Sequence, residues 1–156
     1  MKVYHVSNVI VDKPDVRHSR EALDFGKGFY VTFLHEQAVK YGERFKYRGR
    51  DAILNVYELD DKWRTGNIQT FDSYNREWLD FVAANRKRLP VEKFDAVEGG
   101  IADDKIFRTV DLYLADEINK EEALKRLKFE KPNHQICFLS QSLIDKYLKF
   151  EYSEDL

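Results

Sequence analysis

The glycine pair Gly26 and Gly28 stands directly before an aromatic and β-branched segment, residues 29–33. Such residues are enriched in strands, so the glycines are predicted to form a turn that enters a strand. In a dinucleotide-binding βαβ fold the glycine turn opens a helix instead, and a third glycine follows at a fixed spacing. Neither condition is met here, so a Rossmann fold is excluded.

Hydrophobic periodicity and turn residues predict the elements on either side of this turn. Strands are expected at residues 2–11, 29–33, 51–59, 94–98 and 135–139, and helices at 36–48, 75–88 and 142–148 and after capping residues at Asp103 or Asp104 and at Asn119. In the first strand, the two-residue period places His5 and Ser7 on one face and Val6 on the other. Because the strands are few and irregularly spaced, and two helices follow one another, a mixed α+β sheet is predicted.

Composition limits the class of protein and of partner. The 156 residues suit one compact domain, and the charged fraction of 35% and hydrophobic fraction of 43% are those of a globular chain. With 26 basic against 28 acidic residues, the net charge of −2 supplies no general attraction to nucleic acid or anionic lipid. The basic segment 44–50 is interpreted as a solvated helix end.

The cysteine and histidine content argues against disulfide and metal chemistry. Cys137 is the lone cysteine, and it lies in an apolar run where a buried side chain is expected. His18, His35 and His134 lack the paired spacing or companion cysteines of a zinc site, so no metal is expected. The chain start lacks the apolar core of a signal peptide and no run reaches membrane-spanning length, which predicts a cytoplasmic location without a membrane partner.

Four positions resemble the ADP-ribosyltransferase superfamily of the histidine-tyrosine type, the diphtheria toxin and PARP-like group. They are His5 on the first strand, Tyr30 at the end of the G-x-G turn, Tyr41 eleven residues later and Gln135 at the start of a late strand. In that group the triad is written H-Y-E, with variants at the third position.

A narrower resemblance, to the bacterial family catalogued as domain of unknown function 3990, covers nearly the whole chain. It rests on His5 and on the segments 23–30, 36–38, 77–82, 85–86, 102–104 and 133–135, in that order. These two resemblances imply a single domain over residues 1–156, with a split mixed β-sheet of ADP-ribosyltransferase type and flanking helices.

The implied activity is mono-ADP-ribosylation with NAD as co-substrate. ADP-ribose would pass to a macromolecular acceptor, a protein or nucleic acid, and nicotinamide would be released. The resemblance also suggests the toxin of a bacterial toxin-antitoxin or defence module, opposed by a small antitoxin-like partner protein.

The resemblance assigns roles on the first strand. His5 looks like the histidine that hydrogen-bonds the ribose hydroxyls of NAD. Val6 stands where relatives commonly have glycine, and its backbone would hold the nicotinamide amide. Ser7 would be the second amide anchor.

The aromatic positions would enclose the nicotinamide ring. The turn formed by Gly26 and Gly28 would set Tyr30 against one face, and Tyr41 would pack on the other, as offset stacking favours for a flat, partly cationic ring. Ala38 stands where many relatives have a serine, so one hydroxyl contact to the carboxamide is missing. The chain has nine tyrosines and 11 phenylalanines, so a structural role for these aromatics is the alternative.

Gln135 matches the third triad position and offers a dipole where a glutamate would offer a charge. This argues against polymer elongation and against modification of arginine, and leaves mono-ADP-ribosylation or slow NAD hydrolysis. Candidate carboxylates to deprotonate an acceptor are Asp103, Asp104, Asp80 and Glu98. A helix cap at Asp103 or Asp104 and a solvated side chain at Asp80 are the alternatives.

Two other functions stay open at this point. One is removal of a 2′-phosphate from RNA, which would need basic residues beside His5 and is disfavoured by the net charge of −2. The other is a non-catalytic module that binds NAD, ADP-ribose or a partner protein, which Val6 and Gln135 favour.

Overall fold

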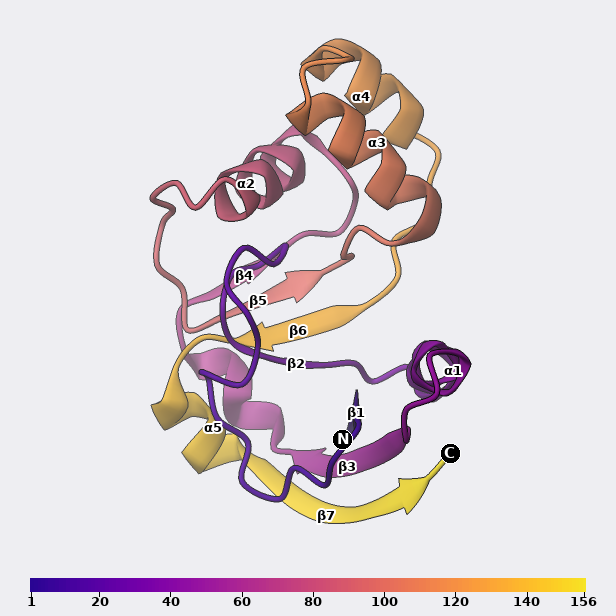
Figure 1. Cartoon of the computed structure of the whole chain (residues 1–156). Coiled ribbons are helices and arrows are strands. Elements are labelled where there is room, and N and C mark those ends of the chain that lie inside the picture. The colour runs from indigo at the N-terminus through magenta and orange to yellow at the C-terminus, as the bar shows by residue number, and fades with distance from the viewer.

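A computed structural model describes residues 1–156, apart from the side chain of Asp104. Over these residues the chain forms five α-helices and two β-sheets (Figure 1). The predicted mixed α+β class is therefore confirmed.

Sheet A has the strand order β1-β3-β7 and is antiparallel throughout. Its strands are β1 (Lys2–Ser7), β3 (Ile53–Leu59) and β7 (Leu148–Asp155). The central strand β3 is apolar on both faces because its side chains pack on either side of the sheet, as the sequence predicted.

Sheet B has the order β2-β6-β5-β4. Its strands are β2 (Phe29–Val31), β6 (Gln135–Phe138), β5 (Ala96–Gly99) and β4 (Ile68–Thr70). The strand β4 runs parallel to β5, whereas β6 is antiparallel to both its neighbours, so this sheet is mixed.

Several of the helices begin after a residue whose side chain accepts a hydrogen bond from a free backbone N–H of the first turn. The helices are α1 (His35–Tyr47), α2 (Arg76–Arg86), α3 (Asp104–Leu114), α4 (Lys120–Leu127) and α5 (Gln141–Tyr147), with a 3₁₀ helix η1 (Asp61–Thr65). The side chain of Asn119 accepts a hydrogen bond from the backbone N–H of Glu122, which confirms the predicted start of α4. Asn75 caps α2 in the same way through the N–H of Trp78.

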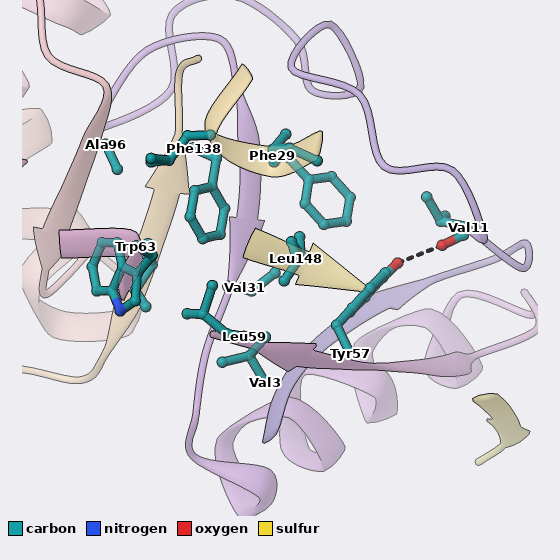
Figure 2. Packing of buried hydrophobic residues seen from close by; sticks show 13 residues of the cluster. Val3, Val11, Phe29, Val31, Tyr57, Leu59, Trp63, Ala96, Phe138 and Leu148 are labelled. Carbon is teal, nitrogen blue, oxygen red and sulfur yellow. Dashed lines mark hydrogen bonds between the residues drawn. The ribbon is translucent and has the colours of Figure 1, made fainter. Parts of the chain in front are cut away.

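The first core cluster lies between the two sheets (Figure 2). It includes Val3, Phe29, Trp63 and Phe138, and the Tyr57 hydroxyl donates a 2.6 Å hydrogen bond to the Val11 carbonyl at its edge. Burying such a hydroxyl without a partner would be costly, so this bond holds the chain after β1 against β3.

A second cluster lies between the other face of sheet B and helices α2, α3 and α4, which stand together in Figure 1. It includes Trp78 and Leu79 of α2, Val110 of α3 and Leu127 of α4. Cys137 belongs to it and is fully buried, as predicted. Since side chains alternate along a strand, Tyr30 packs against this cluster while its neighbour Phe29 enters the first.

The structure corrects several predicted boundaries and adds elements. The strand β1 ends at Ser7, four residues earlier than predicted. Beyond it the Asn55 side chain, and not a neighbouring strand, bonds the backbone: it accepts from the Val11 N–H and donates to the His5 and Val9 carbonyls. The elements η1, β4 and β7 were not predicted. The strand β7 was missed because it follows α5 with no intervening loop, so no turn residue marks its start.

Candidate functional site

The edge strands of the two sheets meet along the β1–β2 seam. Tyr4 and Thr32 form an isolated antiparallel bridge there, with N–H···O distances of 2.8 and 3.0 Å. Continuing this register would place Val6 opposite Tyr30. In the described chain this bridge stands alone, so the strands diverge, and Val6 pairs with Leu54 of β3 but not with Tyr30 of β2.

His5 spans this opening with its side chain. Its Nδ1–H donates to the Tyr30 carbonyl at 2.7 Å, and its Nε2 lies 3.2 Å from Nε2 of His18. With the proton on Nδ1, Nε2 accepts, and His18 therefore supplies the proton between the two rings. Loss of hydration lowers the His5 pKa to about 4, and the nearby His18 lowers it further, whereas the hydrogen bond to Tyr30 opposes the shift. The ring is therefore neutral at pH 7.

Tyr30 closes the glycine turn from inside. Its hydroxyl donates to the Gly26 carbonyl at 2.6 Å and accepts from the Phe25 N–H at 3.1 Å, and its ring lies parallel to that of Phe25. Burial raises the Tyr30 pKa well above its ordinary value, so the phenol stays protonated. The hydroxyl thus shapes the turn, and the ring packs against the second core cluster.

The two glycines are required for different reasons. Gly26 has a φ of +91°, the left-handed region that favours glycine. At Gly28 a Cβ would lie 2.4 Å from the Phe138 carbonyl oxygen and 2.7 Å from Cys137 Sγ, because the turn runs close against β6. The turn leads directly into β2, as predicted, and forms no phosphate cradle at a helix start.

Gln135 is the first residue of β6, as predicted, and is half-buried. Cys137 pairs with Tyr30 across the β2–β6 ladder, and Gln135 lies two residues before Cys137 on the same face. Tyr30 and Gln135 are therefore diagonal neighbours on one face of sheet B.

Tyr41 lies on α1 with 48% of its surface exposed. Its ring meets the edge of Phe45 at 5.6 Å, and the Arg44 guanidinium lies 5.8 Å from the ring centre. Among the described contacts, none joins Tyr41 directly to His5, Tyr30 or Gln135. The link is indirect: Gln37, one turn earlier on the same side of α1, binds the backbone of His134, the residue before Gln135.

Other predicted residues have structural partners. Val6 is buried with Ala38 in a third cluster between α1 and sheet A, and the Ser7 hydroxyl accepts from the Val9 N–H at 3.4 Å. Asp80 forms a 2.7 Å ion pair with Lys120 on the helical surface.

Two further carboxylates stand where α3 begins. Asp103 is the residue that precedes the first turn of α3, the position predicted for a cap. The side chain of Asp104, the other candidate, lies outside the described part of the structure.

Comparison with protein families shows to which family the chain belongs. A family model described as "Protein of unknown function (DUF3990)" matches residues 1–150. The chain belongs to this family. No curated protein and no solved structure matches it significantly.

Motifs that carry the resemblance to this family meet at Asp24, whose role the sequence did not indicate. One carboxylate oxygen of Asp24 binds the Arg86 guanidinium at 2.6 and 2.7 Å, and the other accepts from the Ala102 N–H at 2.5 Å. Asn85 donates to the Asp24 carbonyl at 3.0 Å. Segments 23–30, 85–86 and 102–104 therefore form one buried anchor that holds the glycine turn.

A hollow of about 300 Å³ lies beside the same turn. Its lining includes Phe25, Phe81, Phe94 and Leu139, together with Gly26 and Lys27 of the turn.

The sequence also missed a buried polar network under the seam. The Glu98 carboxylate receives a 2.9 Å hydrogen bond from His134 Nε2 and a 2.6 Å ion pair from Arg64. Burial would raise the Glu98 pKa, but the bonds from His134 and Arg64 outweigh it, and the pKa falls below its ordinary value. The one sequence signal for His134 is that segment 133–135 is among the motifs that carry the family resemblance.

The described residues contain no group of three or more histidine, cysteine, aspartate or glutamate side chains placed to hold a metal ion. None of their helices is long and apolar enough to cross a membrane.

Proposed function

We propose that this protein is a mono-ADP-ribosyltransferase that uses NAD as co-substrate. The observation that carries the proposal is the pairing of His5 with Tyr30 across the diverging β1–β2 seam. A neutral imidazole, the backbone edge of Val6 and the strand that carries the aromatic ring of Tyr30 meet at this seam, and the imidazole packs on the Phe29 ring at 4.5 Å. These groups suit a ribose hydroxyl, a carboxamide and a flat heteroaromatic ring, respectively.

His5 would act through Nε2. The Nδ1 proton is committed to the Tyr30 carbonyl, so Nε2 presents a lone pair to a ribose hydroxyl once the His18 imidazole gives way. Neutrality at pH 7 suits this task, because a protonated ring would have no acceptor.

The remaining residues would orient the ring and the bond to be cut. Tyr30 would cover one face of the nicotinamide, Tyr41 the other, and the side-chain dipole of Gln135 would face the ribose. As the nicotinamide–ribose bond breaks, its electron pair leaves with nicotinamide and positive charge develops on the ribose. A dipole stabilises this charge less than a carboxylate would, which favours a single transfer or hydrolysis over polymer elongation.

The split mixed-sheet type of the ADP-ribosyltransferases belongs to the same proposal. Support comes from the two sheets, which touch along the edge strands that carry His5 and Tyr30. The toxin role, the macromolecular acceptor and the small antitoxin-like partner follow from the resemblance and stay predictions.

The test uses NAD labelled in the adenosine part. The wild-type protein should bind it, release nicotinamide and pass label to a macromolecule in a bacterial extract. His5→Ala should abolish release, whereas His35→Ala, which alters an exposed histidine that packs edge-on against Tyr4 at 5.0 Å, should not. Failure of the wild type to release nicotinamide from NAD would contradict the proposal, whether or not NAD binds.

The second candidate is a non-catalytic NAD- or ADP-ribose-binding module. It is favoured by the uncharged Gln135 at the position where a glutamate would promote bond breaking. Calorimetry separates the two: this candidate predicts NAD binding without nicotinamide release, and the loss of binding in His5→Ala.

A further inference from the structure

We propose that His134 is a positioning residue of the NAD site, which sets Gln135 through β6 and Tyr41 through α1. The inference rests on the proposed function for its consequence in catalysis. Its structural part, the coupling of β6 to α1, rests on the hydrogen bonds between Gln37 and the backbone of His134.

The His134 side chain is held on both ring nitrogens. Nε2 donates to Glu98 of β5 at 2.9 Å, and Glu98 is itself held by Arg64 of η1 at 2.6 Å. The ring's Nδ1 then carries the lone pair, and it receives the Thr32 hydroxyl at 3.2 Å. The ring is therefore fixed between β5 and the end of β2.

The backbone of the same residue is held by α1. Gln37 donates its side-chain N–H to the His134 carbonyl at 2.7 Å and accepts from the His134 N–H at 2.9 Å. This pair of bonds resembles one step of a β-ladder formed by a side-chain amide. It joins the first turns of α1 to the residue that enters β6.

The position of His134 gives these contacts their meaning. It immediately precedes Gln135, which begins β6 and pairs with Gly99 of β5. Strand ends are usually free to fray, but here four hydrogen bonds and a Phe33 ring centred 3.7 Å away restrain the residue next to the triad position. Tyr41 lies one turn beyond Gln37 on α1. His134 therefore restrains the backbone that carries Gln135 and, through Gln37, the helix that carries Tyr41.

Burial indicates that His134 acts through its neighbours. Its side chain is 12% exposed, and Thr32, the hydroxyl bound to its Nδ1, is 3% exposed. Neither the imidazole nor this hydroxyl is open to an incoming substrate. His134 is buried, hydrogen-bonded through both ring nitrogens and adjacent to the site. Such a residue positions its neighbours and does not itself contact the substrate.

Two substitutions separate positioning from simple stabilisation. His134→Phe keeps a ring but removes both ring hydrogen bonds, whereas His134→Gln retains an amide N–H for Glu98 and an oxygen for the Thr32 hydroxyl. The matched control is Leu127→Ala on α4, which removes buried apolar volume far from the seam. Kinetics of nicotinamide release and backbone hydrogen exchange are measured on all four proteins, at a temperature where each is folded.

For His134→Phe, kcat/KM for NAD should fall about 10- to 100-fold, the scale expected when reacting groups lose their alignment. Exchange should rise locally at residues 134–136 and in the first turns of α1. His134→Gln should recover most of the loss, and Leu127→Ala should lower the melting temperature without either change. Because Gln37→Met removes the backbone clamp and leaves the ring contacts, it should give the same local exchange even if His134→Phe fails to fold.

The outcomes distinguish this inference from the proposed function. Unchanged kinetics and unchanged local exchange in His134→Phe and Gln37→Met would overturn the positioning role while wild-type turnover still supported the enzyme. A wild type without NAD turnover would overturn the function, whereas loss of local protection in both variants would still establish the coupling between β6 and α1.

Discussion

His5 on β1 donates its Nδ1 proton to the backbone carbonyl of Tyr30 on β2 over 2.7 Å, beyond the single backbone bridge between the two segments. A side chain thus closes the gap that the backbone leaves open. The same bond fixes the tautomer of His5, directs its Nε2 outward, and ties the orientation of the ring to the strand that carries Tyr30.

The burial of His5 predicts an acid-sensitive protein. Because its pKa in the folded state is about 4, against 6.5 in the unfolded chain, the unfolded state binds the proton first as pH falls. The stability supplied by the neutral ring is present above pH 6.5 and declines between pH 6.5 and 4, by at most about 3 kcal/mol at 1.36 kcal/mol per pKa unit. The pKa of His18 is also lowered by burial, so it adds to the same slope.

Urea unfolding at several pH values checks this dependence. His5→Phe keeps the ring and removes the titration, so its stability should fall less than that of the wild type over this window. Titration of the His5 imidazole by NMR with a midpoint near 6.5 would contradict the prediction.

Two exposed tyrosines on one helix test the stacking role. Tyr41→Ala should raise KM for NAD about tenfold, since base–aromatic stacking is worth about 1–3 kcal/mol. Tyr47→Ala is the matched control, because Tyr47 lies on the same helix α1 and is 95% exposed. Steady-state nicotinamide release gives both constants. Equal KM values for the two variants would remove Tyr41 from the site, and circular dichroism should show α1 intact in both.

The close approach at Gly28 predicts a steric cost. An alanine there would force Cβ to within 2.4 Å of the Phe138 carbonyl oxygen, a backbone atom that cannot move without breaking the β2–β6 ladder. We expect a loss of about 1–3 kcal/mol or more in the free energy of unfolding. Gly49→Ala has open space around its Cβ but a φ of +72°, so it reports backbone strain alone, about 1 kcal/mol. Denaturant midpoints that rank Gly49→Ala as the more damaging change would refute this account.

The sequence predicted most strands and helices because their signals are local. The strand residues of β1, the apolar run of β3 and the capping residue Asn119 each depend on neighbours within a few positions. The missed strand β7 depends on pairing with β3 nearly a hundred residues away, and its own residues are largely exposed. Such long-range pairing leaves little trace in a local pattern.

The site divides in the same way. The glycine turn and the positions of His5 and Gln135 at strand sites were predicted, because turn chemistry and strand ends are visible in the sequence. The His18 contact to His5 and the His134–Glu98 network join residues 13 and 36 positions apart, and only the folded chain brings them together. Asp24 was missed for the same reason, since its partner Arg86 is 62 residues away.

The Asp24 anchor predicts an unequal pair of substitutions. Asp24→Asn leaves the Arg86 guanidinium, 15% exposed, without its charge partner, and should cost about 3–5 kcal/mol. Asp80→Asn removes an exposed ion pair to Lys120 and should cost less than about 1 kcal/mol. Thermal unfolding of both variants checks the difference. Equal losses would show that the Asp24 pair contributes no more than a surface contact.

Gln135→Glu tests the chemistry of the triad position most directly. If the ribose of NAD develops positive charge beside this side chain, a carboxylate should stabilise it better than an amide, and kcat for nicotinamide release should rise about tenfold or more. Half-burial of Gln135 leaves room for a hydrated carboxylate, so the fold should tolerate the change. Gln69→Glu on β4, two strands away from β6 in sheet B, adds the same charge and should leave kcat unchanged. A Gln135→Glu protein that binds NAD with wild-type affinity yet shows no gain in release would place the cleaved bond away from Gln135.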